Sequence, residues 1–314
     1  MNQIIPFVAR LNDAETAAWI AALSMAMPHE RIIAFQQLST EERATARVAI
    51  VANPDPTELD QLPALLWVHS LWAGVERLLT ELRNPKIGIV RLEDPQLAAT
   101  MAEAALAWTL YLHRDMPAYA AQQRARVWHA LPFRLPAERC VAILGLGHMG
   151  ARAAQTLVAN GFDVIGWSRT GKIIEGVKTF VGDATLNDVL ARADIVVCIL
   201  PLTADTRNLL NESRLAHCKP NAALINFGRG AIVNTADLIA ALDRGTLSHV
   251  VLDVFEVEPL PAESALWHHE KVTVLPHISA PTHHGSAAKV VAENIARYRA
   301  TGVMPKTVNR KVGY

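Results

Sequence analysis

Apolar residues gather in short runs that alternate with helical patterns along most of the chain. In the first hundred residues the runs lie at 3–8, 31–35, 48–52, 65–69 and 88–92, and a helical pattern covers residues 14–27. Short β-rich runs separated by helices or turns are typical of a parallel sheet with helices on its faces. This part of the chain therefore predicts a complete small α/β domain.

Residues 98 to about 128 show alanine, leucine and methionine at helical spacing, with Pro117 near the middle. The pattern predicts one long or kinked helix between two domains. Such an apolar helix either packs into a core or forms a dimer surface, and the spacing alone leaves both open.

A second series of apolar runs begins after the prolines of a linker, Pro132 and Pro136. Strands are expected at 140–144, 163–167, 195–200, 223–226, 250–254 and 272–275, with helical patterns between them. This series predicts a doubly wound sheet. A helix over 283–301 follows the last strand, and its easiest use is to return to the first domain.

The predicted fold class is therefore α/β with two domains. A Rossmann-type doubly wound cofactor domain, residues 100–280, is inserted into a flavodoxin-like, discontinuous substrate domain, residues 1–99 and 281–314. The length of 314 residues fits two domains and implies a cleft.

Charge and hydropathy indicate which kinds of binding partner the protein can have. The 30 basic and 30 acidic residues cancel and form no long run of one sign, so nothing favours nucleic acid or an anionic membrane. No apolar run approaches the roughly 18 residues of a membrane span, and the N-terminus lacks the basic region of a signal peptide. We expect a soluble, cytoplasmic protein with a small-molecule partner.

Cys140, Cys198 and Cys218 show neither a CxxC nor a metal-ligand spacing. We interpret them as buried free thiols of a reducing cytoplasm, with a disulfide or a metal site as the alternative. No metal is expected.

The clearest motif is a glycine loop between the predicted strand at 140–144 and a helical pattern at 151–158. The loop residues expected to bind a cofactor are Gly145, Gly147, His148, Met149 and Gly150. In a strand–GxGxxG–helix context the glycines permit a tight turn, backbone approach to a pyrophosphate, and close packing of helix on strand. The pyrophosphate would be held at the helix N-terminus.

The residues at the end of the predicted strand 163–167 indicate which of the two nicotinamide cofactors is bound. An acidic residue there would bond the ribose 2′-hydroxyl and repel a 2′-phosphate. The chain has Ser168 and Arg169 at this point, with Lys172 close behind, whereas Asp163 lies at the wrong end of the strand. An arginine grips phosphate with two parallel hydrogen bonds, so NADPH is preferred over NADH.

Arg229 and His277, at expected strand ends, and Glu258 in the segment 253–260 have the chemistry for reducing a 2-keto acid. Arg229, between two glycines, would anchor and polarise the substrate, and His277 would deliver the proton. Glu258 would hydrogen-bond His277 and favour its protonated form. We expect these three residues to be catalytic and Arg229 and His277 to contact substrate.

Neighbouring polar residues receive lesser roles. Asp253 ends its own strand and is expected to bond the nicotinamide carboxamide, whereas Glu256 is interpreted as a solvated neighbour. His283 and His284 are interpreted as residues at a helix start, with substrate contact as the alternative.

With these residues the chain resembles the D-isomer-specific 2-hydroxyacid dehydrogenases, most closely the glyoxylate/hydroxypyruvate reductase A group. The resemblance covers essentially the whole chain and rests on GLGHMG at 145–150, LPLT at 200–203, NFGRG at 226–230, LDVFEVEPLP at 252–261, LPHISAPT at 275–282, RLED at 91–94 and WSRT at 167–170. It implies a homodimer built on the cofactor domains, the three catalytic positions above, and contacts of Leu200, Pro201 and Phe227 with the cofactor.

The family further implies that backbone amides near Ala73 and Gly74 hold the substrate carboxylate. Trp72 stands where a small residue is usual, and it either reshapes the substrate pocket or packs between domains. The segment 51–54 lacks the Trp-His pair expected of the reductase group, which leaves a bulkier 2-keto acid as an alternative substrate.

The resulting expectation is NADPH-dependent reduction of glyoxylate to glycolate or of hydroxypyruvate to D-glycerate. Alternatives are a bulkier 2-keto acid, or a cofactor-sensing binding module of the same fold without turnover. A β-hydroxyacid dehydrogenase would carry the glycine loop at the start of its chain and use a catalytic lysine, whereas here the loop begins at Gly145. Formate or phosphite oxidation would favour NAD.

Overall fold

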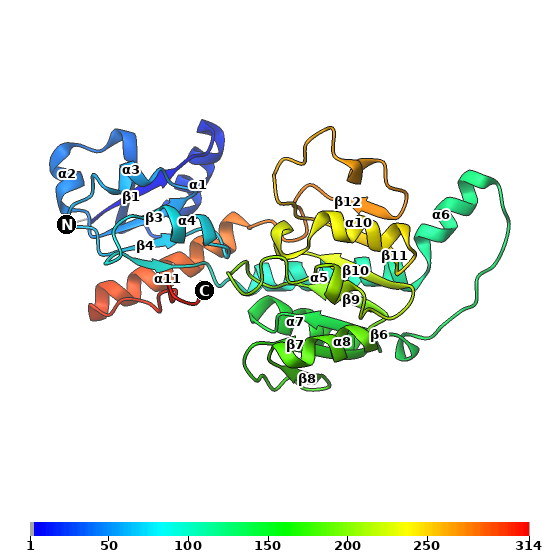
Figure 1. The fold of residues 1–314 in the computed structure, drawn as a ribbon. Helices are drawn as coiled ribbons and strands as arrows, with labels where there is room; N and C mark the ends of the chain where they lie inside the picture. The colour runs from blue at the N-terminus through cyan, green and yellow to red at the C-terminus, as the bar shows by residue number, and fades with distance from the viewer. Residues whose placement is uncertain (1–2, 314) are drawn as a thin grey trace. The chain divides into compact units, whose positions relative to one another are not determined.

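The computed structural model describes residues 3–313, which form two compact units (Figure 1). Unit 1 contains the residues up to Gln96 together with those from Thr282 onward, and unit 2 is the continuous segment Leu97–Pro281. None of the helices in the described residues is long and apolar enough to cross a membrane.

Unit 1 is built on a parallel sheet with the strand order β2-β1-β3-β4-β5. Its strands are β1 Gln3–Ala9, β2 Glu30–Ala34, β3 Val48–Ala52, β4 Trp67–Ser70 and β5 Gly88–Val90. Its helices are α1 Asp13–Ala26, α2 Thr40–Thr45, α3 Pro56–Leu59, α4 Glu76–Glu81 and α11 His284–Thr301. This order is that of flavodoxin-like sheets, so the predicted fold class is confirmed for this unit.

Alternation of side chains divides the sheet of unit 1 into two buried faces. Val68 packs with residues of α3 and α4 on one face. Trp67 and His69, its neighbours in β4, face the other way, where Tyr298 packs edge-on against the Trp67 ring at 5.4 Å and Asn294 bonds His69. Helix α11 therefore completes the core of a sheet whose strands lie more than 190 residues earlier in the chain.

Unit 2 has a seven-stranded parallel sheet in the order β12-β11-β10-β9-β6-β7-β8, a doubly wound Rossmann arrangement with one further strand. The strands are β6 Cys140–Leu144, β7 Asp163–Ser168, β8 Lys178–Val181, β9 Ile195–Cys198, β10 Ala222–Asn226, β11 Leu247–Leu252 and β12 Val272–Val274. Sequence analysis missed β8, an edge strand with no fully buried residue, because its apolar pattern is weak.

Helices cover both faces of this sheet. Val141 and Ile143 of β6 pack against α5 Pro95–His113 and α7 His148–Ala159. Ala142 and Leu144 pack on the opposite face. The helices of that face are α8 Leu186–Arg192, α9 Glu212–Leu215 and α10 Thr235–Asp243. The near-continuous apolar strands of the sequence thus reflect burial on both sides.

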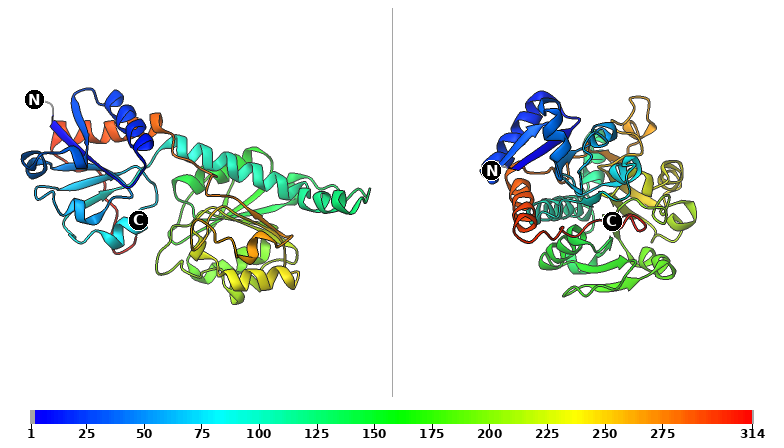
Figure 2. Two further views of the ribbon diagram at one scale, coloured as in Figure 1. Left: turned by 90° about the horizontal axis from the view of Figure 1, so that it is seen from above. Right: turned by 90° about the vertical axis from the view of Figure 1, so that its left-hand side faces the viewer.

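The pattern over 98–128 predicts one long or kinked helix, and the structure has two helices with a break between them. Helix α5 ends at His113, Asp115 adopts a left-handed backbone with φ 54°, and α6 runs from Met116 to Ala125. Pro117 therefore lies in the first turn of α6, where its missing N–H costs nothing. In Figures 1 and 2, α6 and the segment after it project away from the sheet of unit 2.

Candidate active site

The glycine loop connects β6 to α7 as the sequence indicates. Its glycines differ in the reason why glycine occurs at each position. Gly145 has a left-handed φ of 103°, which forms the tight turn. A Cβ on Gly150 would overlap the carbonyl oxygen of Gly145, so only glycine lets the helix pack this closely on the turn. A Cβ on Gly147 would meet no described atom within 4 Å.

This geometry fits a dinucleotide pyrophosphate. Gly147 is the N-cap of α7, it is exposed, and no side chain caps the helix there. The first N–H groups of a helix are unsatisfied within the helix and favour an anion. His148 is exposed in the first turn, whereas Met149 packs partly on the apolar core. The residues present thus provide an open, donor-rich helix end for the phosphates of NADPH.

The residues expected at the cofactor ribose follow β7. The hydroxyl of Ser168, which is buried, donates to the carbonyl of Thr170 at 2.7 Å and fixes the turn. Arg169 comes directly after the strand, is 45% exposed, and lies 3.9 Å from the carboxylate of Asp205. Lys172 is exposed in the same loop. Their contact with a 2′-phosphate stays a prediction.

Loops after β9 and β10 approach each other closely beside the glycine loop. A Cβ on Gly228 would lie 2.6 Å from the carbonyl oxygen of Leu200, and one on Gly145 would lie 3.2 Å from the Leu200 side chain. Pro201 accepts a 2.7 Å hydrogen bond from the hydroxyl of Thr206. Phe227 is buried. These contacts pack the loops after β9 and β10 closely together, and the contacts of Leu200, Pro201 and Phe227 with the cofactor stay predictions.

Arg229 projects from a loop whose backbone is fixed on both sides. Asn226, at the end of β10, accepts from the N–H of Gly228 and donates to the carbonyl of Arg229, both at 3.1 Å. A Cβ on Gly230 would overlap the backbone of Phe255. Gly230 thus lets the arginine loop lie directly against the segment that leads to Glu258.

His277 and Glu258 form the pair that the sequence predicts. Nδ1 of His277 lies 2.8 Å from Oε2 of Glu258, and the other carboxylate oxygen accepts the N–H of Phe255 at 2.9 Å. Their side chains are 53% and 36% exposed, so both can be reached by a small molecule. His277 has a left-handed φ of 56°, a strained conformation of the kind found at functional sites.

Asp253 has a role that sequence analysis missed. Its side chain is buried at the end of β11, and its two carboxylate oxygens accept the backbone N–H groups of Ile278 and Ser279 at 2.7 and 3.0 Å. These are the two residues after His277, so Asp253 anchors the loop that carries the histidine. A buried acid at a strand end was the available signal. Its predicted bond to the nicotinamide carboxamide remains a prediction.

The predicted substrate loop lies in unit 1, between β4 and α4. The N–H of Trp72 donates to the hydroxyl of Ser70 at 3.0 Å, which shapes the turn that leads to Ala73 and Gly74. The indole of Trp72 packs edge-on against Trp19 at 6.1 Å, and Trp19 in turn contacts His284 at 4.1 Å. Trp72 is thus partly held by packing within its own unit, and its contact with substrate stays a prediction.

The remaining polar neighbours behave as interpreted from the sequence. The ring of His283 accepts from the N–H of Ser286 and caps α11, which begins at His284. Glu256 is 67% exposed, with Arg207 at 3.7 Å.

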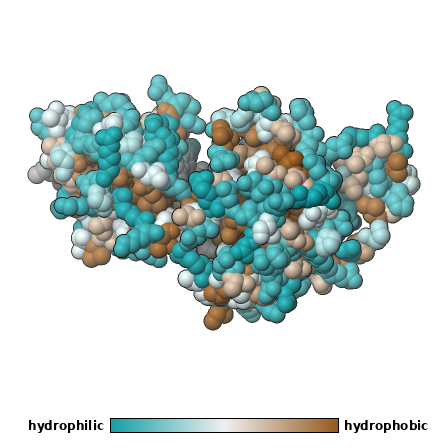
Figure 3. Space-filling view, viewed as in Figure 1, coloured by the Kyte–Doolittle hydropathy of each residue, from teal (hydrophilic) through white to brown (hydrophobic). Residues whose placement is uncertain are grey.

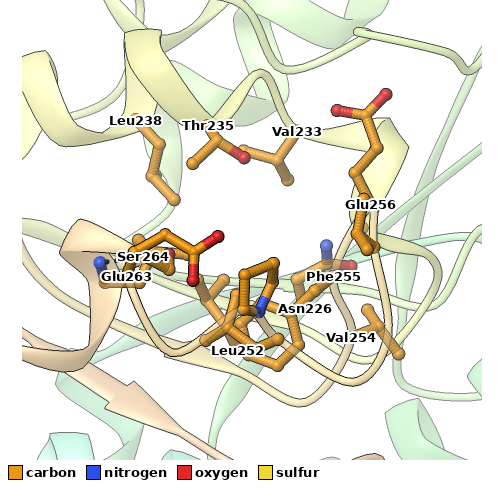
Figure 4. A pocket seen from close by; sticks show the side chains of 15 residues that line it. Asn226, Val233, Thr235, Leu238, Leu252, Val254, Phe255, Glu256, Glu263 and Ser264 are labelled. Atoms are coloured by element: carbon orange, nitrogen blue, oxygen red, sulfur yellow. Dashed lines mark hydrogen bonds between the residues drawn. The ribbon is translucent and has the colours of Figure 1, made fainter.

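A pocket of about 280 Å³ lies next to the arginine loop (Figure 4). Val233, Thr235 and Leu238 form one wall, and Leu252 and Phe255 lie opposite. None of the three predicted catalytic residues lines it. The side chains proposed to act on the substrate therefore lie outside this pocket.

The cysteines are free thiols, and burial raises the pKa of each to about 12. Cys198 and Cys218 are buried, and Cys140 is half-buried. Within the described residues no cluster of three or more potential metal ligands occurs.

Comparison with known proteins agrees with this geometry. Residues 106–279 match the family model described as "D-isomer specific 2-hydroxyacid dehydrogenase, NAD binding domain". The chain is 35% identical to glyoxylate/hydroxypyruvate reductase A of Salmonella enteritidis, over 95% of this chain and 96% of that protein.

Solved structures extend the similarity to the fold of the whole chain. A D-isomer-specific 2-hydroxyacid dehydrogenase from Xanthobacter autotrophicus, in complex with NADPH and MES, is 38% identical with a TM-score of 0.94. The NADPH-dependent glyoxylate/hydroxypyruvate reductase of Sinorhizobium meliloti, in complex with NADP and sulfate, is 33% identical with a TM-score of 0.91. Both comparisons cover 100% of each chain. The resemblance seen in the motifs is confirmed: the chain belongs to the D-isomer-specific 2-hydroxyacid dehydrogenase family.

Proposed function

We propose that this protein is an NADPH-dependent reductase of a small 2-keto acid, which converts glyoxylate to glycolate or hydroxypyruvate to D-glycerate. The observation that carries the proposal is the 2.8 Å bond between His277 and Glu258, in the same unit as Arg229 and the glycine loop. The names of the relatives from Salmonella and Sinorhizobium support the choice of substrate.

Side chains of the protein supply the proton for the keto oxygen and stabilise the negative charge that develops on it. Because Nδ1 of His277 bonds Glu258, Nε2 is the ring nitrogen that donates a proton to the keto oxygen. Glu258 stabilises the imidazolium before that transfer and fixes the ring orientation. Arg229 binds the keto acid and stabilises the negative charge that develops on its oxygen. NADPH, when bound at the glycine loop, would supply the hydride that reduces the keto carbon.

The proposed preference for NADPH rests on Arg169 at the end of β7, supported by Ser168 and Lys172. The Xanthobacter and Sinorhizobium relatives were solved with NADPH and NADP. An arginine at this point favours a 2′-phosphate over a free hydroxyl. Replacing Arg169 with Asp should reverse the preference, and an unchanged preference would remove its assigned role.

The reaction is tested by initial rates for glyoxylate, hydroxypyruvate, pyruvate and phenylpyruvate, each with NADPH and NADH at equal concentration. Fast NADPH-dependent turnover of the first two is expected. Activity with only the bulkier acids would keep the mechanism and reject the substrate assignment. Absence of turnover with all four would favour a binding module.

His277→Ala tests the proton donor. Loss of a general acid typically costs about 10²- to 10⁴-fold in rate, so kcat should fall within that range while the Kd of NADPH stays nearly constant. The exposed His217 offers a matched control, and His217→Ala should leave both values unchanged. Equal loss of turnover and NADPH binding in His277→Ala would instead indicate a structural role.

We further propose that the protein is a cytoplasmic homodimer. The segment after α6 exposes apolar side chains, namely Val127, Trp128, Phe133 and Leu135, and brown residues appear at that end of the molecule in Figure 3. Exposed apolar clusters of this kind favour association. Sedimentation should give a dimer, and the double variant Trp128→Ser, Phe133→Ser should shift it toward monomer.

A further inference from the structure

The strand order of unit 2 brings an acidic residue next to the arginine assigned to the 2′-phosphate. In the sheet, β6 lies between β9 and β7. The glycine loop follows β6, Arg169 follows β7, and Asp205 lies in the loop that follows β9. Parallel strands end at the same edge, so a dinucleotide bound on the glycine loop has Arg169 and Asp205 on the two loops that flank it.

The two side chains form an ion pair. The guanidinium Nη1 of Arg169 lies 3.9 Å from Oδ2 of Asp205, and the side chains are 45% and 78% exposed. A pair this open is weak, because water screens it. It is nevertheless the kind of contact that an incoming phosphate dianion would replace.

The backbone around Asp205 is held in place. The hydroxyl of Thr206 donates to the carbonyl of Pro201 at 2.7 Å and accepts the N–H of Thr203 at 2.8 Å. The N–H of Arg207 also bonds the carbonyl of Thr203 at 3.0 Å. Asp205 therefore sits on a tightly bonded turn, which fixes the position of its backbone.

We propose that Asp205 is a cofactor-selectivity residue: its carboxylate is the internal counter-ion of Arg169 and competes with the 2′-phosphate of NADPH. This inference rests on the proposed function. An anion held beside the phosphate site weakens the binding of a 2′-phosphate, both by occupying the guanidinium and by direct repulsion. A cofactor without the 2′-phosphate is much less affected.

The proposal predicts a gain of affinity on removing the carboxylate. Unit charges about 4 Å apart interact by about 1 kcal/mol in water, which corresponds to roughly fivefold in Kd. Asp205→Asn should therefore lower the Kd of NADPH and of 2′,5′-ADP about three- to tenfold at low salt. The Kd of NADH and of 5′-AMP should change much less, and the gain should shrink as salt screens the charges.

The experiment is a double-mutant cycle on the full chain without added substrate. Kd values for the four nucleotides are measured by calorimetry in wild type, Asp205→Asn, Arg169→Gln and the double variant. Glu212→Gln is the matched control, because Glu212 forms a similarly exposed pair with Arg244 at 3.4 Å on another part of the unit. The control should not alter any of the four Kd values.

Three results would overturn the proposal. Equal tightening of NADPH and NADH by Asp205→Asn would show a general charge effect. An unchanged Kd for 2′,5′-ADP would show that the carboxylate does not compete. An undiminished gain in the Arg169→Gln background would show that the carboxylate does not act as the counter-ion of Arg169.

Failure of the underlying function gives a different pattern. If Arg169→Gln leaves the ratio of NADPH to NADH affinity unchanged, the assignment of Arg169 to the 2′-phosphate is wrong. If that ratio falls while Asp205→Asn has no effect, only the role of Asp205 is rejected. Keto-acid turnover is not needed for either conclusion.

Discussion

Asp253→Asn would remove the anchor of the histidine loop with almost no change in size. The carboxylate accepts two backbone N–H groups, whereas an asparagine side chain accepts with one oxygen and presents its own NH₂ to the second donor. One hydrogen bond to a charged group is therefore lost, and a partly buried N–H is left without an acceptor.

The cost follows from the burial of Asp253, whose side chain is almost fully covered. A hydrogen bond to a charged group contributes about 1.5–3 kcal/mol, so we expect unfolding to become easier by roughly 2–4 kcal/mol once the unsatisfied donor is included. For a domain of this size each kcal/mol shifts Tm by about 2–4 °C, which gives a fall of roughly 4–16 °C.

Catalysis should fall as well, because the loop residues held by Asp253 follow His277 directly. A displacement of about 1 Å in a catalytic group can cost on the order of 10²-fold in rate. Calorimetry and steady-state kinetics measure the two effects. Asp243→Asn is the control, since Asp243 is 68% exposed and its carboxylate lies 3.3 Å from the ring of His269.

The outcomes separate anchoring from ligand binding. A lower Tm with a lower kcat supports the anchoring role. An unchanged Tm with weaker NADPH binding would refute it and assign Asp253 to the cofactor alone. An unchanged Tm, kcat and Kd would reject both roles.

Three further predictions follow from burial and close packing. Burial lowers the pKa of His69 from 6.5 to about 4. Between these two pH values the imidazole is protonated in the unfolded chain but mostly neutral in the folded state. Stability should therefore fall by about 3 kcal/mol as pH falls through this window, and His69→Asn should flatten this slope in denaturant titrations at several pH values. Gly150→Ala should lower Tm, because a Cβ on Gly150 meets protein atoms. Gly147→Ala should leave Tm unchanged, because its Cβ meets no described atom, but it should weaken NADPH binding measured by calorimetry. Burial raises the pKa of all three thiols to about 12, so a thiol reagent at pH 8 should label them far more slowly in native protein than in guanidinium.

The sequence was sufficient for features that depend on local pattern. Strands buried on both faces form continuous apolar runs, and β3 and β6 have the predicted bounds. The glycine loop could be found because Gly145 and Gly150 are required by backbone geometry within a few residues. The pairing of His277 with Glu258 was also predictable, since both follow strands that end at one edge of the sheet.

Other features depend on contacts that no local pattern encodes. The break between α5 and α6 depends on the left-handed backbone of a single residue, Asp115. Strand β8 is defined by pairing with β7 at the sheet edge, where burial is incomplete. The bonds from Asp253 to the loop after His277 join residues about 25 positions apart, and only the fold brings them together.

The discontinuity of unit 1 has a consequence for the order in which the chain can fold during synthesis. Trp67 and His69 need α11 to cover their face of the sheet, and α11 is made only after the whole of unit 2. The ribosome therefore releases all of unit 2 as an uninterrupted segment while unit 1 still lacks its last helix. Domains usually mature in the order of their synthesis, but here the first strands to emerge are completed last.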